Sequence, residues 1–93
     1  MILYVELDCF IYEAQSLKDK RAVVKRVITR LQNSYNITIS ELDYQDLWQR
    51  TRLGIATISP DRKRAEQVID SCLAKVDSFT EIEYTSIERQ WYG

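Results

Sequence analysis

The chain has 93 residues, 45% of them hydrophobic and 29% charged, and we expect one small domain, residues 1–93, near the lower limit of what a single hydrophobic core stabilises. Its formal net charge of -1 and its sequence pI of about 5.4 exclude a protein that coats nucleic acid over its whole surface, so any such binding has to be local. The absence of histidine removes the commonest general base near neutral pH and the commonest metal ligand.

Residues 2–12 alternate between two side-chain faces, which predicts a β-strand. One face is apolar and is expected in the core: Leu3, Val5, Leu7, Cys9 and Ile11. The other face carries aromatic and acidic side chains: Tyr4, Glu6, Asp8, Phe10 and Tyr12. An aromatic sheet face suits self-association, so Tyr4, Phe10 and Tyr12 are candidates for a dimer interface. Glu6 and Asp8 alone are a weak signal for a divalent ion.

A first helix is predicted from Ser16, which can act as its N-cap with Asp19 three residues later in the capping-box position. Its apolar stripe consists of Leu17, Val24, Val27, Ile28 and Leu31. Lys20 projects near this stripe, and we expect it to find a carboxylate or carbonyl partner, with Glu41 or Asp43 as candidates.

Positive charge is concentrated on this helix, because residues 16–31 hold six cations and one anion. Lys18, Arg21 and Lys25 share one flank, while Arg26 and Arg30 line up on another. These five residues are candidates for nucleic-acid binding, because Lys and Arg neutralise phosphates without a preformed pocket. The alternative is a solvated helix face without a ligand.

A second strand is predicted over residues 37–42, a turn over residues 43–46, and a third strand that ends near Ile58. Within residues 46–52, an extended backbone would place Trp48, Arg50 and Arg52 on one side. These three are further nucleic-acid candidates, because an aromatic ring beside guanidinium groups can stack a base. A protein-interface anchor and a simple cover for a hairpin end are the alternatives.

Ser59 and Pro60 predict the start of a second helix, with Ser59 as N-cap and Pro60 at the first helical position. Its apolar periodicity is the clearest in the chain and consists of Ala65, Val68, Ile69, Cys72, Leu73 and Val76. A last strand is expected at Ile82–Tyr92. The order β-α-β-β-α-β predicts an α+β, ferredoxin-like sandwich, with a four-stranded antiparallel sheet and two helices on one face. Right-handed crossovers are expected to place strands 1 and 3 in the centre, parallel to each other.

No motif for chemistry is present. The two cysteines, Cys9 and Cys72, are too few and too far apart for a zinc site or a redox motif, so both are expected to pack as small hydrophobes. Nor does the sequence contain a glycine-rich phosphate loop or a nucleophile elbow. We therefore expect no enzyme activity, no catalytic residue, no metal and no cofactor. The N-terminal run lacks the basic region of a signal peptide, and no apolar run is long enough to span a bilayer, so no membrane partner and a cytoplasmic location are expected.

Several short motifs stand out together: SLKDKR at residues 16–21, Arg30-Leu31, Tyr35-Asn36, QDLWQR at residues 45–50, and Leu53-Gly54 running into Ile58-Ser59. In these motifs the chain resembles the YlxP-like family of small bacterial proteins, a domain of unknown function. The resemblance implies a ferredoxin-like fold and no catalytic residues. Members of that family are often encoded beside translation-initiation and ribosome-maturation factors, which implies a link to RNA or to ribosomal particles. Asp19 and Tyr35 stand where Glu and Phe are frequent. The C-terminal strand beyond Phe79 matches weakly, so nothing is inferred there.

Three hypotheses about function follow. The first is a non-enzymatic domain, a homodimer, that binds RNA or a ribosomal particle through its basic helix. The second is a homodimeric protein-interaction module without nucleic-acid contact, and the third, less supported, is a metal-dependent or small-molecule enzyme.

Overall fold

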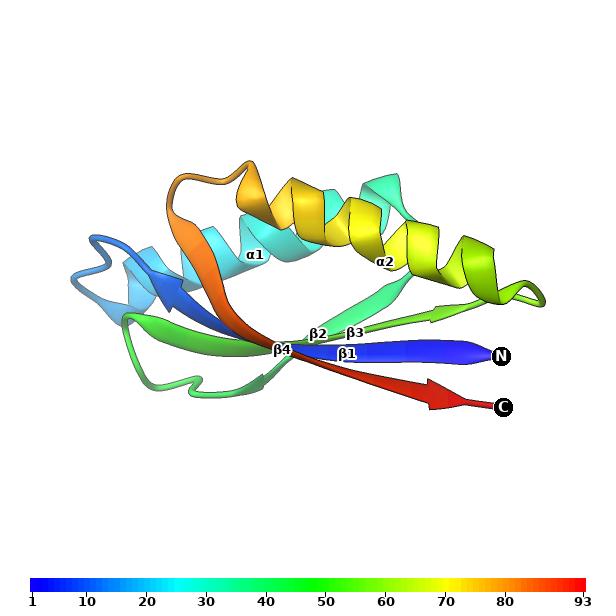
Figure 1. The fold of residues 1–93 in the computed structure, drawn as a ribbon. Coiled ribbons are helices and arrows are strands. Elements are labelled where there is room, and N and C mark those ends of the chain that lie inside the picture. Colours follow the sequence, from blue (N-terminus) through cyan, green and yellow to red (C-terminus); the bar gives the residue numbers. More distant parts are fainter.

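The computed structural model describes all 93 residues as one four-stranded sheet covered on one face by two helices (Figure 1). The elements are β1 (Ile2–Ile11), α1 (Leu17–Ser34), β2 (Thr38–Asp43), β3 (Arg50–Ile58), α2 (Arg62–Asp77) and β4 (Ile82–Tyr92). The strand order is β2-β3-β1-β4, which confirms the predicted ferredoxin-like sandwich. Both termini lie at the same end of the sheet (Figure 1).

The two central strands are β1 and β3, as predicted, but the expectation that they run parallel is wrong. Ile2 pairs with Ile58 and Phe10 pairs with Arg50, which is an antiparallel register. The reason lies in the connections. The crossover through α1 makes β2 parallel to β1, and the turn between β2 and β3 then reverses the chain, so β3 opposes β1 when it inserts between them.

The core lies between the sheet and the helices. All five side chains of the predicted inner face of β1 are buried, and they pack with residues of both helices such as Leu31 and Ile69. Ile28 and Val68, predicted for the core, pack against its edge and are partly buried. Cys9 and Cys72 are buried free thiols, which confirms their packing as small hydrophobes.

The start of α1 agrees with the prediction. Ser16 is the N-cap, and its hydroxyl oxygen accepts a hydrogen bond from the Asp19 backbone N–H at 3.0 Å. The Asp19 carboxylate accepts in turn from the Gln15 N–H at 3.2 Å, which satisfies a further backbone donor.

The start of α2 does not agree, because Asp61 and not Ser59 is its N-cap. The Ser59 N–H donates to the Met1 carbonyl oxygen at 3.0 Å, which keeps Ser59 in extended pairing with the chain before β1. Asp61 then caps the helix by accepting from the Lys63 N–H at 3.0 Å. Neither helix is long and apolar enough to cross a membrane.

Candidate functional site

The outer surface of α1 carries five exposed cations, Lys18, Arg21, Lys25, Arg26 and Arg30, which we call the α1 basic face. Two small side chains, Ala22 and Thr29, lie between them. Lys25, Arg26 and Arg30 surround these small residues in a shallow hollow of about 480 Å³. The hollow brings three cationic side chains around space that an anionic group can enter.

The cations of this face differ in their partners. Arg26 pairs with Glu81, and the Arg30 guanidinium lies 5.5 Å from the centre of the Phe79 ring. Lys18, Arg21 and Lys25 form no ion pair, no side-chain hydrogen bond and no cation–π contact. Their charges are therefore fully available to an external anion.

This surface is positive in a molecule that is otherwise acidic. Residues 17–34 contain six cations and one anion, whereas the rest of the chain has seven cations and thirteen anions. Such segregation focuses the field over one face and steers anions toward it.

Lys20 lies on the inner side of α1 and is completely buried, at 0% exposure. Its ammonium group donates to the carbonyl oxygens of Tyr44, at 2.7 Å, and Gln45, at 3.2 Å, and lies 2.8 Å from the Glu41 carboxylate. The prediction that Lys20 finds a carboxylate or carbonyl partner, with Glu41 as a candidate, is confirmed. The two carbonyl bonds fasten the loop between β2 and β3 beside the first turn of α1.

That loop presents Leu47 and Trp48 outward, and the Trp48 side chain is 51% exposed. Arg50 stacks over the ring of Tyr44, with 4.2 Å from its guanidinium carbon to the ring centre. Trp48 precedes β3, so it is not part of the extended segment that was expected to align it with Arg50 and Arg52. Trp48 and Arg50 are nevertheless both exposed at this end of the sheet.

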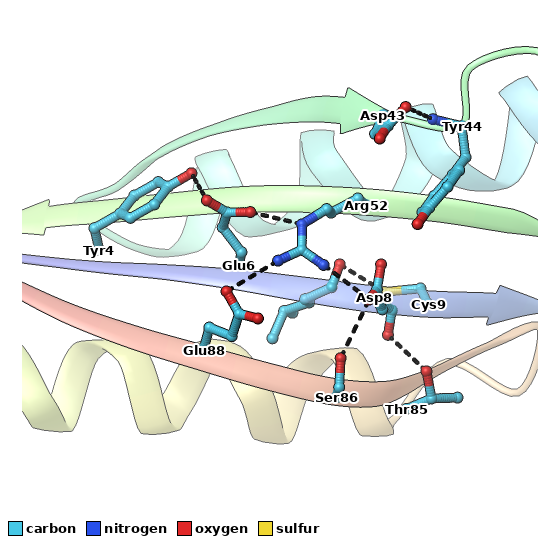
Figure 2. Close-up of polar contacts among 11 residues, drawn as sticks. Tyr4, Glu6, Asp8, Cys9, Asp43, Tyr44, Arg52, Thr85, Ser86 and Glu88 are labelled. Atoms are coloured by element: carbon cyan, nitrogen blue, oxygen red, sulfur yellow. Dashed lines mark hydrogen bonds and ion pairs between the residues drawn. The ribbon is translucent and has the colours of Figure 1, made fainter.

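Arg52 lies in a polar network at the centre of the open sheet face (Figure 2). Its guanidinium contacts Glu6 at 2.6 Å and Asp8 at 2.8 Å, both on β1, and Glu88 on β4 at 3.2 Å. Hydrogen bonds from Arg52 and then from the Tyr4 hydroxyl hold the pKa of Glu6 below its usual value. Hydrogen bonds to Glu6 and then to Asp8 raise the pKa of Arg52. Burial, and then the hydrogen bond to Glu6, raises the pKa of Tyr4 to about 12.

This network changes the interpretation of two sets of sequence candidates. The charge of Arg52 is already balanced by three carboxylates, so it is not free as Lys18 or Lys25 are. Its guanidinium also lies between Glu6 and Asp8, the pair considered for a divalent ion. One oxygen of Asp8, Oδ1, is buried without a hydrogen-bond partner.

The three aromatic residues of the candidate dimer interface do not form one patch. The Tyr4 hydroxyl donates a hydrogen bond to Glu6 at one end of the network. At the other end, Phe10 packs edge-to-face with Tyr12, with 5.0 Å between the ring centres. Tyr12 lies beyond the end of β1, and its hydroxyl donates to Glu83. The polar network separates the two groups.

Sequence reasoning missed an apolar patch at the opposite end of the same face. Ile2 pairs with Ile58 on β3 and with Tyr92 on β4, so these three side chains are neighbours. All three are exposed, and Ile58 reaches 65%. The strand register alone brings them together, so alternation within one strand gave no signal of the patch.

Comparisons with known proteins place the chain in a family. The family described as "Protein of unknown function (DUF503)" matches residues 2–89, which extends well past the motifs that end before Phe79. The "Uncharacterized protein YlxP" of Bacillus subtilis (strain 168) is 51% identical over 92 residues, 99% of this chain and 100% of that protein.

Solved structures share the fold at low sequence identity. A de novo designed protein, Foldit4, superposes with a TM-score of 0.62 at 12% identity and covers both chains fully. A C-terminal segment of the alpha subunit of aIF2 from Pyrococcus abyssi superposes with a TM-score of 0.57 at 16% identity, over 98% of this chain and 51% of that chain. The designed ferredoxin-fold protein LFR1 1 gives a TM-score of 0.56 at 19% identity, over 97% of this chain and 83% of that chain. At these identities the likeness concerns the fold alone, whereas the family match and the Bacillus relative show that the chain belongs to the DUF503 family of proteins of unknown function.

Proposed function

We propose that the protein is a non-enzymatic, cytoplasmic domain that binds RNA, free or in a ribosomal particle, through the α1 basic face. The observation that carries this proposal is the set of three exposed cations, Lys18, Arg21 and Lys25, that have no partner within the protein. Residues three and four apart on a helix are neighbours, so these three can neutralise consecutive phosphates of one strand. The hollow over Ala22 and Thr29 lets a backbone approach the helix closely.

Trp48 and Arg50 provide a second contact in this proposal. Lys20 ties their loop to the first turn of α1, beside Lys18 and Arg21, so a strand bound at that end of α1 lies near the loop. An exposed indole on an anchored loop can stack an unpaired base with little loss of conformational entropy. The acidic centre of the open sheet face repels phosphate, so RNA is not expected there.

The test is binding of a single-stranded RNA measured by fluorescence anisotropy as a function of salt. Each phosphate contact contributes a slope of about -0.7 to the plot of log affinity against log salt. The variant K18S/R21S/K25S should flatten the slope by about two units, while its unfolding free energy changes by less than about 1 kcal/mol.

The control is K63S/K75S/R89S, which removes the same number of cations from α2 and β4 and should retain most of the slope. If the α1 variant binds RNA as the parent does, or if the parent does not bind, the basic face is only a solvated surface. Release of the protein from ribosomal particles at high salt, after co-sedimentation at low salt, would extend the result to the cell extract.

A second function, self-association as a protein-interaction module, is supported by the patch of Ile2, Ile58 and Tyr92. Light scattering over a range of concentrations would detect a homodimer, and Ile58→Lys should return it to a monomer. A parent that stays monomeric at high concentration would contradict this function without affecting the first.

A further inference from the structure

The first turn of α2 consists of three consecutive cations, Arg62, Lys63 and Arg64, and contains no acidic residue. This arrangement opposes the helix dipole, whose N-terminal end is positive and favours anionic side chains. Arg62 has a carboxylate neighbour, Glu66 at 3.5 Å, and lies over the Trp91 ring. Lys63 and Arg64 have no carboxylate neighbour. A local arrangement that costs stability is a common mark of a binding site.

The chain terminus adds another positive charge beside this turn. The α-ammonium group of Met1 donates to the Ser59 carbonyl oxygen at 3.0 Å, and the Ser59 N–H donates back to Met1. These bonds hold the ammonium group close to the segment that leads into α2.

A cavity of about 480 Å³ lies between the end of α1 and the start of α2, and Arg64 is the cation that lines it. Tyr35 also lines the cavity, and Ile58 and Val68 supply apolar surface. A smaller hollow of about 170 Å³ continues past Tyr35 and Arg64 along α2. The size of the cavity suits a small organic ligand.

The polar side chains of the cavity have unused donors. The side chains of Ser34, Tyr35 and Asn36 make no hydrogen bond within the protein. Ser59 is only 9% exposed, and its hydroxyl oxygen accepts from the Asp61 N–H at 3.1 Å but donates to no protein atom. The Ser59 hydroxyl hydrogen is therefore available to a ligand or to water.

One residue of the cavity lining, Asp61, is negatively charged and repels an anion. Its carboxylate accepts from the Lys63 N–H at 3.0 Å and serves as the cap of α2, so part of its charge is balanced by the helix. The charges of Arg64, Lys63 and the Met1 ammonium group outnumber it.

We propose that this cavity binds a small phosphomonoester, with Arg64 paired to the phosphate, the Ser59 hydroxyl donating to it, and Tyr35 and Val68 packing against the organic part. A guanidinium can donate two parallel hydrogen bonds to a phosphate, which favours Arg64 as the main ligand. The cavity shares no residue with the α1 basic face, so the proposal stands apart from RNA binding through that face.

The experiment is a titration of the full-length protein followed by ¹H–¹⁵N NMR, with adenosine 5′-monophosphate, inorganic phosphate and adenosine as probes. The monophosphate should shift the amide signals of residues 34–36 and 59–64 in a saturable way and leave residues 18–30 unchanged. Arg64→Gln should weaken this binding at least tenfold. Lys75→Gln, at the other end of α2 and without an ion pair or a side-chain hydrogen bond, is the control and should bind as the parent does.

The probes identify the ligand class. Saturable binding of the monophosphate and of inorganic phosphate, but not of adenosine, supports a phosphate site. Tighter binding of the monophosphate than of phosphate further supports contact of the organic part with Tyr35. Binding that survives Arg64→Gln, shifts confined to α1, or no saturable shift at millimolar concentration would overturn the proposal. Unchanged thermal unfolding of the Arg64→Gln variant would show that any loss of binding is not a loss of fold.

Discussion

Replacement of Lys20 by methionine tests why a fully buried ammonium group lies in this fold. The change keeps the apolar stem but removes the three contacts to Glu41 and to the carbonyl oxygens of Tyr44 and Gln45. Removing one partner of a buried ion pair costs about 3–5 kcal/mol, since the other charge remains desolvated. Glu41 keeps its hydrogen bond from the Thr51 hydroxyl, at 2.6 Å, and is 20% exposed, so we expect the lower end, about 3 kcal/mol.

The assay is urea unfolding followed by the fluorescence of Trp48 and Trp91. A loss of this size lowers the midpoint by roughly 1–3 M urea in a small domain. The double variant K20M/E41Q should recover at least about 1 kcal/mol, because the unpaired carboxylate is gone. Lys18→Met is the control, since Lys18 is exposed and unpaired, and it should change stability by less than about 0.5 kcal/mol. A loss below about 1 kcal/mol in K20M, or no recovery in the double variant, would refute the reasoning.

Three further outcomes follow from the core and the sheet. Leu31→Ala, at a fully buried position of α1, should lose about 2–5 kcal/mol of unfolding free energy in the same urea assay, and a smaller loss would contradict its place in the core. Arg52→Gln should lower the melting temperature at pH 7 but much less near pH 3. The pKa of Glu6 is depressed in the folded state, so its stabilising contribution is complete above about pH 4.5 and disappears as pH falls through the folded value. Burial raises the pKa of Cys9 to about 12 and that of Cys72 to about 11, so a disulfide reagent at pH 8 should label neither thiol until the protein unfolds, and rapid labelling of the native protein would show that they are accessible.

The sequence by itself determined the elements and their faces. Strict alternation in β1 and the helical period in α2 identify the buried side chains, because the two periods are properties of the local backbone. The cap at Ser16 and the requirement that Lys20 have a partner were also predictable, since each depends on chemistry within one or two segments. The position of the exposed cations on α1 follows from helical spacing alone.

Only the tertiary structure decided what lies opposite each of these residues. Arg52 meets Glu6, 46 residues before it, and Glu88, 36 residues after it, and no local pattern specifies that meeting. The same holds for the patch of Ile2, Ile58 and Tyr92, which depends on the register of three strands. The N-cap of α2 is Asp61 and not the predicted Ser59, because the Ser59 N–H donates to the carbonyl oxygen of Met1, far from it in the sequence. Local periodicity fixes which way a side chain points, whereas its neighbours are set by long-range pairing, and that pairing decides which charges remain free to bind a ligand.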